Sequence, residues 1–211
     1  MNGHLFCGCP ESLFRRGGRV RAWTKRHLLW MVAEYIEQLG ALAQEAAYRQ
    51  AFKNWSDVCG LTFEETNDKG EADLLILNRK IDGPGGTLAE HQLPFGDDAQ
   101  LWGSFDSGDK WTTQKPHGPD VIDLVTVACH EFGHGIGLPH LKTPGSLLLP
   151  YYDPKISAPQ PADIAEAQLR YGPPLTTPEP VATSPLLVRV EDVALDIVWT
   201  GEVFPERLSA T

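Results

Sequence analysis

Apolar and polar positions change their spacing along the chain, and each change marks a predicted element. Residues 19–32 mix apolar with β-branched and aromatic residues, which favours a first strand. Apolar positions recur at helical spacing over residues 41–55, which predicts a helix. Residues 61–65 and 72–78 are short runs that indicate two more strands, the second apolar enough to be buried on both faces of a sheet.

Regular patterning fades between residues 82 and 111. This stretch is rich in Gly and Asp, a composition typical of loops whose shape is fixed by a bound cation rather than by a core. A loop this long within a compact domain is usually functional.

An apolar helix is predicted for residues 121–135. Asp120 or Asp123 is available to cap its start. Gly135 and Gly137 are available to end it, because glycine readily adopts the left-handed conformation that follows a helix.

The two ends of the chain differ from the middle. Residues 161–171 predict a last helix before a Gly-Pro-Pro stop, and residues 1–18 have the composition of a loop-like arm. Residues 176–184 resemble a Pro/Thr linker, and residues 186–204 alternate well enough for two short strands. The predicted organisation is an arm (1–18), one folded domain (19–173) and a tail (174–211).

Composition narrows the function classes. The 211 residues, 42% of them hydrophobic, can bury one core of good size. A net charge of −10, without a cluster of Lys or Arg, makes nucleic acid an unfavoured partner. No apolar run has the length of a membrane span, and residues 1–20 lack the apolar stretch of a secretory signal. The 4 cysteines are too few and too unevenly spaced for a disulfide framework.

The sharpest chemical signal is the run His130-Glu131-Phe132-Gly133-His134. Two histidines four residues apart lie on the same face of a helix, which suits two ligands of one metal ion. Glu131 cannot easily share the metal with both, but it can reach a water on that metal and take its proton. The alternative is that ordinary surface or core histidines match this short pattern by chance.

A third histidine extends the pattern. Gly137 can end the helix in the left-handed conformation and turn the chain back, so that His140 supplies a third nitrogen. Three neutral nitrogens with an open fourth position describe a catalytic zinc site rather than a closed structural one.

The full motif places the chain among the metzincin zinc endopeptidases, and its surroundings resemble the matrixins, the matrix metalloproteinase family. The resemblance covers about residues 7–172. Segments similar to the family's are Val127-Ala128-Cys129, Trp55-Ser56-Asp57-Val58 with Leu61-Thr62-Phe63, Ala72-Asp73-Leu74, residues 82–89, and Phe105-Asp106 with Trp111-Thr112. The resemblance implies an α/β (α+β) metzincin fold: a twisted, mixed five-stranded sheet, mostly parallel, with a backing helix, an active-site helix and a C-terminal helix.

Residues 144–152 resemble the family's methionine turn and the wall of its specificity pocket. Leu148 stands where the family has methionine, which forms a hydrophobic base beneath the zinc. Leu and Met are similar in volume, so the exchange costs less than about 1.5 kcal/mol and activity need not be lost. The residues implied for the substrate pocket are Leu148, Pro150, Tyr151 and Tyr152.

Cys7-Gly8-Cys9-Pro10-Glu11 resembles the end of a matrixin propeptide, in which a cysteine thiolate fills the fourth zinc position and keeps the enzyme latent. Cys7 aligns with that cysteine. The usual arginine before it is Phe6 here, and Cys9 is a second thiol that could compete. A terminal cysteine without a role is the alternative.

Two further metal sites can be compared with the family. The resemblance implies a calcium site in the Gly- and Asp-rich stretch. The alternative is that the acidic side chains of this stretch are simply solvated. The family's second, structural zinc lacks its ligands here, because residues 78–81 offer neither His nor Asp, and Glu90 and Ser104 take the other two places. We expect that zinc to be absent, and we expect His4, His27, His91 and His117 to be solvated. The implied calcium ligands are Asp82, Gly83, Gly85, Thr87, Asp106 and Asp109.

The resemblance implies a monomeric zinc endopeptidase that cuts proteins or peptides within the chain, with one catalytic zinc and structural calcium. It also implies a secreted location, although the chain itself shows no signal. Two rivals remain: a zinc-binding module without turnover, and an interaction protein that acts through residues 186–204.

Overall fold

The computed structural model describes residues 5–9, 21–115, 118 and 120–175. The predicted linker and the two predicted tail strands lie outside these residues, as do most of the arm and the side chains of His4 and His117. No helix among the described residues is both long and apolar enough to cross a membrane.

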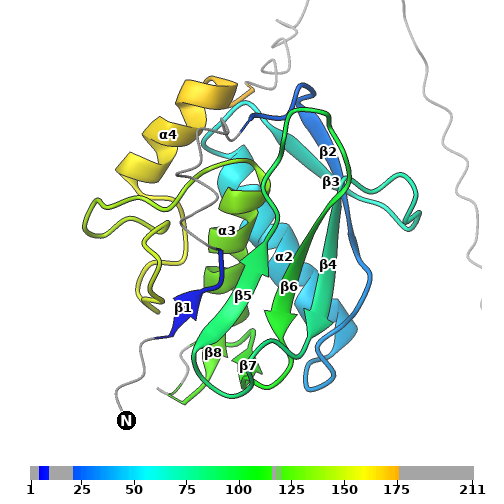
Figure 1. The fold of residues 1–211 in the computed structure, drawn as a ribbon, viewed down its shortest axis with the longest axis vertical. Helices are drawn as coiled ribbons and strands as arrows, with labels where there is room; N and C mark the ends of the chain where they lie inside the picture. The colour runs from blue at the N-terminus through cyan, green and yellow to red at the C-terminus, as the bar shows by residue number, and fades with distance from the viewer. Residues whose placement is uncertain (1–4, 10–20, 116–117, 119, 176–211) are drawn as a thin grey trace, which may run out of the picture. The chain divides into compact units, whose positions relative to one another are not determined.

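The main element is a six-stranded sheet with the order β1-β5-β6-β4-β2-β3. Its strands pair in parallel, except that β5 runs antiparallel to β6. The mixed, mostly parallel sheet expected of a metzincin is therefore present (Figure 1). The five longer strands of this sheet are β2 (His27–Val32), β3 (Thr62–Glu65), β4 (Leu74–Arg79), β5 (Thr87–His91) and β6 (Leu101–Asp106).

The sixth strand corrects the expectation that the arm is a loop outside the core. β1 (Phe6–Cys7) pairs with the edge strand β5, and Cys9 is only 4% exposed. A strand this short has no detectable periodicity, so the sequence did not reveal it. It forms because an edge strand offers unpaired backbone groups to an extended segment.

Helices α2 (Ala41–Ser56) and α3 (Leu124–Gly135) pack against each other and against the sheet (Figure 1). The ring of Phe52 on α2 stacks on Phe132 of α3 with centroids 3.9 Å apart, and Trp30 of β2 lies 5.0 Å from Phe52. These aromatic side chains form the centre of the core and hold α3 in a fixed position relative to the sheet.

Residues 82–111 are more regular than predicted, and this prediction was wrong for β5 and β6. The interior of β6 contains Gly103 and Ser104, which have low strand propensity and hid the element. Gly103 is needed there because a Cβ would lie 2.3 Å from Cδ2 of His91 on the paired strand. Two short strands, β7 (Trp111–Thr112) and β8 (Ile122–Asp123), form a separate parallel pair.

The predicted helices are present, with shifted ends. α3 begins at Leu124 because the two preceding residues form β8. α4 (Pro161–Tyr171) ends at Gly172, whose φ of 76° lies in the left-handed region. The first predicted strand begins only at His27. Trp23, which was expected within the strand, packs toward the end of α3 instead, and its indole donates to the Gly135 carbonyl at 2.8 Å.

Candidate metal centre

His130 and His134 lie one turn apart on α3 and project into one site. Their ring centroids are 4.8 Å apart, and their Nε2 atoms are 3.1 Å apart. The helical spacing of the motif produces this arrangement, because residues i and i+4 lie on the same face.

Backbone carbonyls determine which nitrogen of each ring carries the proton. Nδ1 of His130 lies 2.7 Å from the Leu147 oxygen, and Nδ1 of His134 lies 2.8 Å from the Leu138 oxygen. A carbonyl can only accept, so both Nδ1 atoms are donors and both Nε2 atoms present lone pairs. Burial lowers the pKa of His130 to about 4 and that of His134 well below its usual value, so both rings are neutral near pH 7.

His140 completes a ring of three imidazoles. Gly137 has a φ of 86°, as predicted, and the chain after it turns back alongside α3. The His140 ring lies 5.4 Å from that of His130 and 4.7 Å from that of His134, measured between centroids.

Glu131 is adjacent to this cluster and only 1% exposed. Burial raises the pKa of its carboxyl to about 8, while hydrogen bonds from Cys7 and Cys9 act in the opposite direction. Its Oε1 has no hydrogen-bond partner among the described atoms, and its Oε2 lies 3.7 Å from Sγ of Cys9. The carboxyl group of Glu131 therefore lies at the site with one oxygen not engaged in a hydrogen bond.

Cys7 reaches the cluster from the arm. Its Sγ and one nitrogen each of His130, His134 and His140 all lie within 4.8 Å of one another. Burial raises the pKa of the Cys7 thiol well above its usual value, while the backbone N–H of Cys9, which donates to Sγ of Cys7 at 3.2 Å, acts in the opposite direction.

The backbone around Cys7 forms hydrogen bonds with a separate segment of the chain on each of its two sides. On one side Phe6 N donates to Gly86 O at 3.0 Å and Gly8 N donates to Ala89 O at 2.7 Å. On the other side Cys7 N donates to Pro150 O at 3.0 Å. An extended segment thus fills the groove that passes the histidine cluster.

The donor set fits zinc. Two neutral imidazole lone pairs that face each other at 3.1 Å repel unless a cation lies between them. In a tetrahedral site with Zn–N bonds of about 2.0–2.1 Å, ligand nitrogens lie about 3.3 Å apart, close to this distance. Three nitrogens and one thiolate make a closed tetrahedral set, and removal of the thiolate leaves the open position that catalysis needs.

A buried carboxylate supports one of the candidate ligands, and sequence reasoning missed it. Asp163 on α4 is 0% exposed and accepts hydrogen bonds from the Ser146 hydroxyl and from the amides of Leu147 and Leu148, the two amides at 2.8 and 3.2 Å. The same Leu147 supplies the carbonyl that orients His130. The only local signal is that Asp163 is the third residue of a helix with a capping box, which indicates a cap and not a link to the metal centre.

An apolar pocket opens beside His130 and Glu131. Pro150, Tyr151 and Tyr152 line it, together with Leu147, Leu149, residues of α3 and residues of the arm. Leu148 does not line the pocket: it is fully buried, and a Cβ at Gly133 on α3 would lie 2.7 Å from its Cδ2. Leu148 thus packs under the helix that carries two of the candidate ligands.

The implied calcium residues come together at one end of the sheet. The amides of Asp82 and Gly83 both donate to Oδ2 of Asp106 at 2.8 Å, and Gly85 N donates to Oδ1 of Asp109 at 2.8 Å. Thr87 N donates to Oδ2 of Asp82 at 3.1 Å. The second oxygen of Asp109 is buried without a hydrogen-bond partner among the described atoms. Burial and the neighbouring charges of Asp106 and Asp82 raise the pKa of Asp109, so a cation would be stabilised there.

His91 corrects the expectation that it is solvated. It is 4% exposed, and its ring lies between β6 and α3, where a Cβ at Gly135 would be 2.7 Å from its Cε1. Burial lowers its pKa to about 4. His27 is exposed, as expected.

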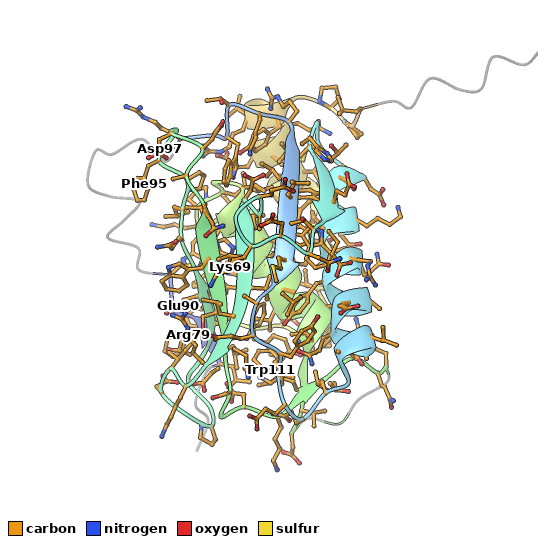
Figure 2. The ribbon with its side chains drawn as sticks, turned by 90° about the vertical axis from the view of Figure 1, so that its right-hand side faces the viewer. Lys69, Arg79, Glu90, Phe95, Asp97 and Trp111 are labelled. Carbon is orange, nitrogen blue, oxygen red and sulfur yellow. The ribbon has the colours of Figure 1, made fainter. Side chains whose placement is uncertain are left out.

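The place of the family's second zinc holds no cluster of ligands in the described part of the chain. Glu90 pairs with Ser104 across β5 and β6. Glu90 and Arg79 lie on the side of the sheet away from α2 (Figure 2). Groups of three or more potential ligands, searched within the described residues, occur only around the three histidines. The absence of this second zinc stays a prediction.

Comparisons with known proteins agree with this geometry. The matrixin family model matches residues 22–172. The chain is 32% identical to the macrophage metalloelastase of Rattus norvegicus over 92% of its own length and 43% of that protein's. It is also 32% identical to the interstitial collagenase of Equus caballus (93% of this chain, 43% of that protein) and to matrix metalloproteinase-20 of Homo sapiens (79% and 36%). The chain spans less than half the length of these curated relatives.

Proposed function

Because this chain belongs to the matrixin peptidase family, we propose that it is a zinc-dependent endopeptidase that hydrolyses internal peptide bonds of proteins. The observation that carries the proposal is the convergence of three imidazoles, two of them with lone pairs oriented by backbone carbonyls, beside the buried carboxylate of Glu131. His130, His134 and His140 hold the zinc.

When bound, zinc supplies a Lewis acid that lowers the pKa of a water molecule and polarises a peptide carbonyl. Glu131 is the general base: it takes the proton of the attacking water and delivers it to the leaving amine. Its burial and its unpartnered Oε1 support this role, because the carboxylate has no competing structural contact at that oxygen.

The substrate lies extended along the edge strand β5, with one side chain in the pocket walled by Pro150, Tyr151 and Tyr152. The arm supports this mode of binding, since its backbone already bonds to β5 on one side and to Pro150 on the other. The apolar lining of the pocket favours an apolar side chain at that position.

The arm keeps the enzyme latent through Cys7. Its thiolate is the fourth zinc ligand, and while it is bound the attacking water has no place on the metal. A calcium ion held by Asp82, Asp106 and Asp109 and by carbonyls of Gly83, Gly85 and Thr87 stabilises the loop before β5. A secreted location, which is general among matrixins, is proposed for this chain as well.

The test is cleavage of a broad internally quenched peptide library by the purified full chain, Cys7→Ser and Cys7→Ser/Glu131→Gln, with calcium present. Cleavage should rise in Cys7→Ser, vanish with a zinc chelator and fall about 10²–10⁴-fold in the double variant. If all three folded, zinc-loaded proteins are silent, the protease proposal is wrong and the chain is a zinc-binding module.

A further inference from the structure

Cys9 is a second thiol at the metal centre that the latency described above does not use. It is 4% exposed, and its Sγ lies 3.2 Å from the carbonyl oxygen and 3.3 Å from the amide nitrogen of His91. On its other side Sγ lies 3.7 Å from Oε2 of Glu131. With Cys7 directed at the histidines, the two thiols of the arm contact both chemical groups of the centre.

The two sulfurs are also close to each other. Sγ of Cys7, Sγ of Cys9 and ligand atoms of Glu131 and His134 all lie within 4.8 Å of one another. The cysteines are separated by Gly8 alone, and side chains two residues apart in an extended segment point to the same side. Cys59 and Cys129, the other described cysteines, are fully buried in the core and do not belong to this group.

We propose that Cys7 and Cys9 form a dithiol modification site, oxidised by low-molecular-weight disulfides to an intramolecular bridge that releases the arm from the metal centre. This inference rests on the proposed latency through Cys7.

Closing the bridge distorts the bound arm. Cα atoms two residues apart in an extended segment are about 6.6 Å apart, at the upper end of the range for a disulfide, whose sulfurs must approach to about 2.05 Å. The commonest Cα separation in a disulfide is about 5.5–6 Å, so closing the bridge shortens the segment at Gly8. The bound arm resists this change, because the Gly8 amide donates to Ala89 O at 2.7 Å and the Cys7 amide donates to Pro150 O at 3.0 Å.

The chemistry balances with glutathione disulfide as the oxidant. The Cys7 thiolate attacks one sulfur of the oxidant, forms a mixed disulfide and expels one glutathione thiolate. The Cys9 thiolate then attacks Sγ of Cys7, forms the Cys7–Cys9 bond and expels the second glutathione. Two protein thiols are oxidised, one disulfide is reduced to two thiols, and the two protons go to the glutathione thiolates. Cys7 reacts first because it is partly exposed, whereas Cys9 is buried.

Release follows from the loss of both thiol contacts. A sulfur in a disulfide has no thiolate charge and is a poor zinc ligand, so the fourth position opens. The contact of Cys9 with Glu131 is lost at the same time, which frees the general base. A bridge within so short a loop is strained and easily reduced, so the change is reversible.

The experiment treats the full zinc-loaded chain with glutathione disulfide and then alkylates the remaining thiols. Tryptic cleavage at Arg15 gives a peptide of residues 1–15 whose only cysteines are Cys7 and Cys9. Mass spectrometry should find this peptide unalkylated and two hydrogens lighter, and alkylated at both cysteines after treatment with a reductant. Cys9→Ser is the matched control and should instead retain one glutathione on Cys7.

A second readout follows the arm without using activity. In the cobalt-substituted chain the thiolate-to-cobalt charge-transfer band should disappear on oxidation and return on reduction. Cys7→Ser should lack the band throughout, and the d–d bands of cobalt should report that the variant still binds metal.

The outcomes separate this inference from the proposed function. A bridge that forms with loss of the cobalt band, in a chain whose Cys7→Ser variant cleaves no peptide, supports the dithiol site and contradicts the protease. Persistent glutathione on wild-type Cys7, or a bridge that leaves the cobalt band unchanged, overturns the inference even where Cys7→Ser cleaves peptides.

Discussion

The carbonyl oxygen of Leu147 lies 2.7 Å from Nδ1 of His130, and the amide of the same Leu147 donates to Asp163 at 2.8 Å. A carboxylate on the last described helix thus determines the position of the peptide group that orients a proposed zinc ligand. Contacts of this kind hold the ligand ring and its tautomer, and their loss commonly weakens metal binding.

Asp163→Asn should therefore weaken zinc binding about 10–100-fold while leaving all three histidines in place. The amide that replaces the carboxylate has one acceptor oxygen, whereas Asp163 accepts from Ser146, Leu147 and Leu148. Competition with a fluorescent zinc chelator measures the change. Glu166→Gln, on the same helix, is the control, and an unchanged zinc affinity in Asp163→Asn would contradict the link.

Calcium should raise the melting temperature of the chain, and Asp109→Asn should require about tenfold more calcium for the same rise. Without calcium the variant should be at least as stable as wild type, because burial and the charges of Asp82 and Asp106 disfavour the ionised Asp109. Thermal unfolding at increasing calcium concentrations tests both statements. Glu71→Gln, an exposed acidic position, is the control, and equal calcium dependence in all three proteins would exclude this site.

The buried His91 should make the free energy of unfolding depend on pH. Burial lowers its pKa from 6.5 to about 4, so the folded state binds the proton more weakly than the unfolded state. The stability that the neutral ring contributes is present above about pH 6.5 and is lost as the pH falls toward 4, by about 3 kcal/mol for this group.

His91→Ala should be less stable than wild type at neutral pH, because it leaves a cavity between β6 and α3, but its stability should fall less on acidification. Urea unfolding of both proteins across this pH range measures the difference. His27→Ala, which removes an exposed histidine, is the control and should keep the wild-type dependence of the unfolding free energy on pH. The same pH dependence in wild type and His91→Ala would contradict a role for His91.

The contact of Leu148 with Gly133 predicts a non-additive pair of substitutions. Gly133→Ala should destabilise the fold by about 1–3 kcal/mol, since its Cβ would lie 2.7 Å from Cδ2 of Leu148 and 2.9 Å from Cζ2 of Trp55. Leu148→Ala should cost about 2–5 kcal/mol through the cavity it leaves. The double variant should be more stable than the sum predicts by about 1 kcal/mol, as measured by denaturant unfolding. Strict additivity would show that the two positions do not share the space.

Elements with strong local signals were predictable from the sequence. α2 has clear helical spacing and α4 has a clear stop signal, and both helices were predicted close to their observed bounds. The positions of His130 and His134 also follow from local spacing on one helix, and Gly137 adopts the conformation expected of it.

What the sequence did not reveal depends on contacts between distant segments. β6 was missed because its Gly103 is explained only by the ring of His91 on the neighbouring strand. His91 was expected in solvent because its spacing gives no indication of burial. The role of Asp163 depends on a loop that precedes it by 15–17 residues, and no periodic pattern reports such a contact.

The attachment of Leu147 to α4 makes the metal centre sensitive to the order of synthesis. The chain leaves the ribosome N-terminus first, so all three histidines are made before the carboxylate that steadies the acceptor of His130. Tyr171 comes later still, and its hydroxyl donates to the Ile136 carbonyl at 2.6 Å, at the end of α3. The proposed zinc binding is therefore expected to reach full affinity only once α4 has been made, and a nascent protein stalled before α4 would carry the candidate ligands without this alignment.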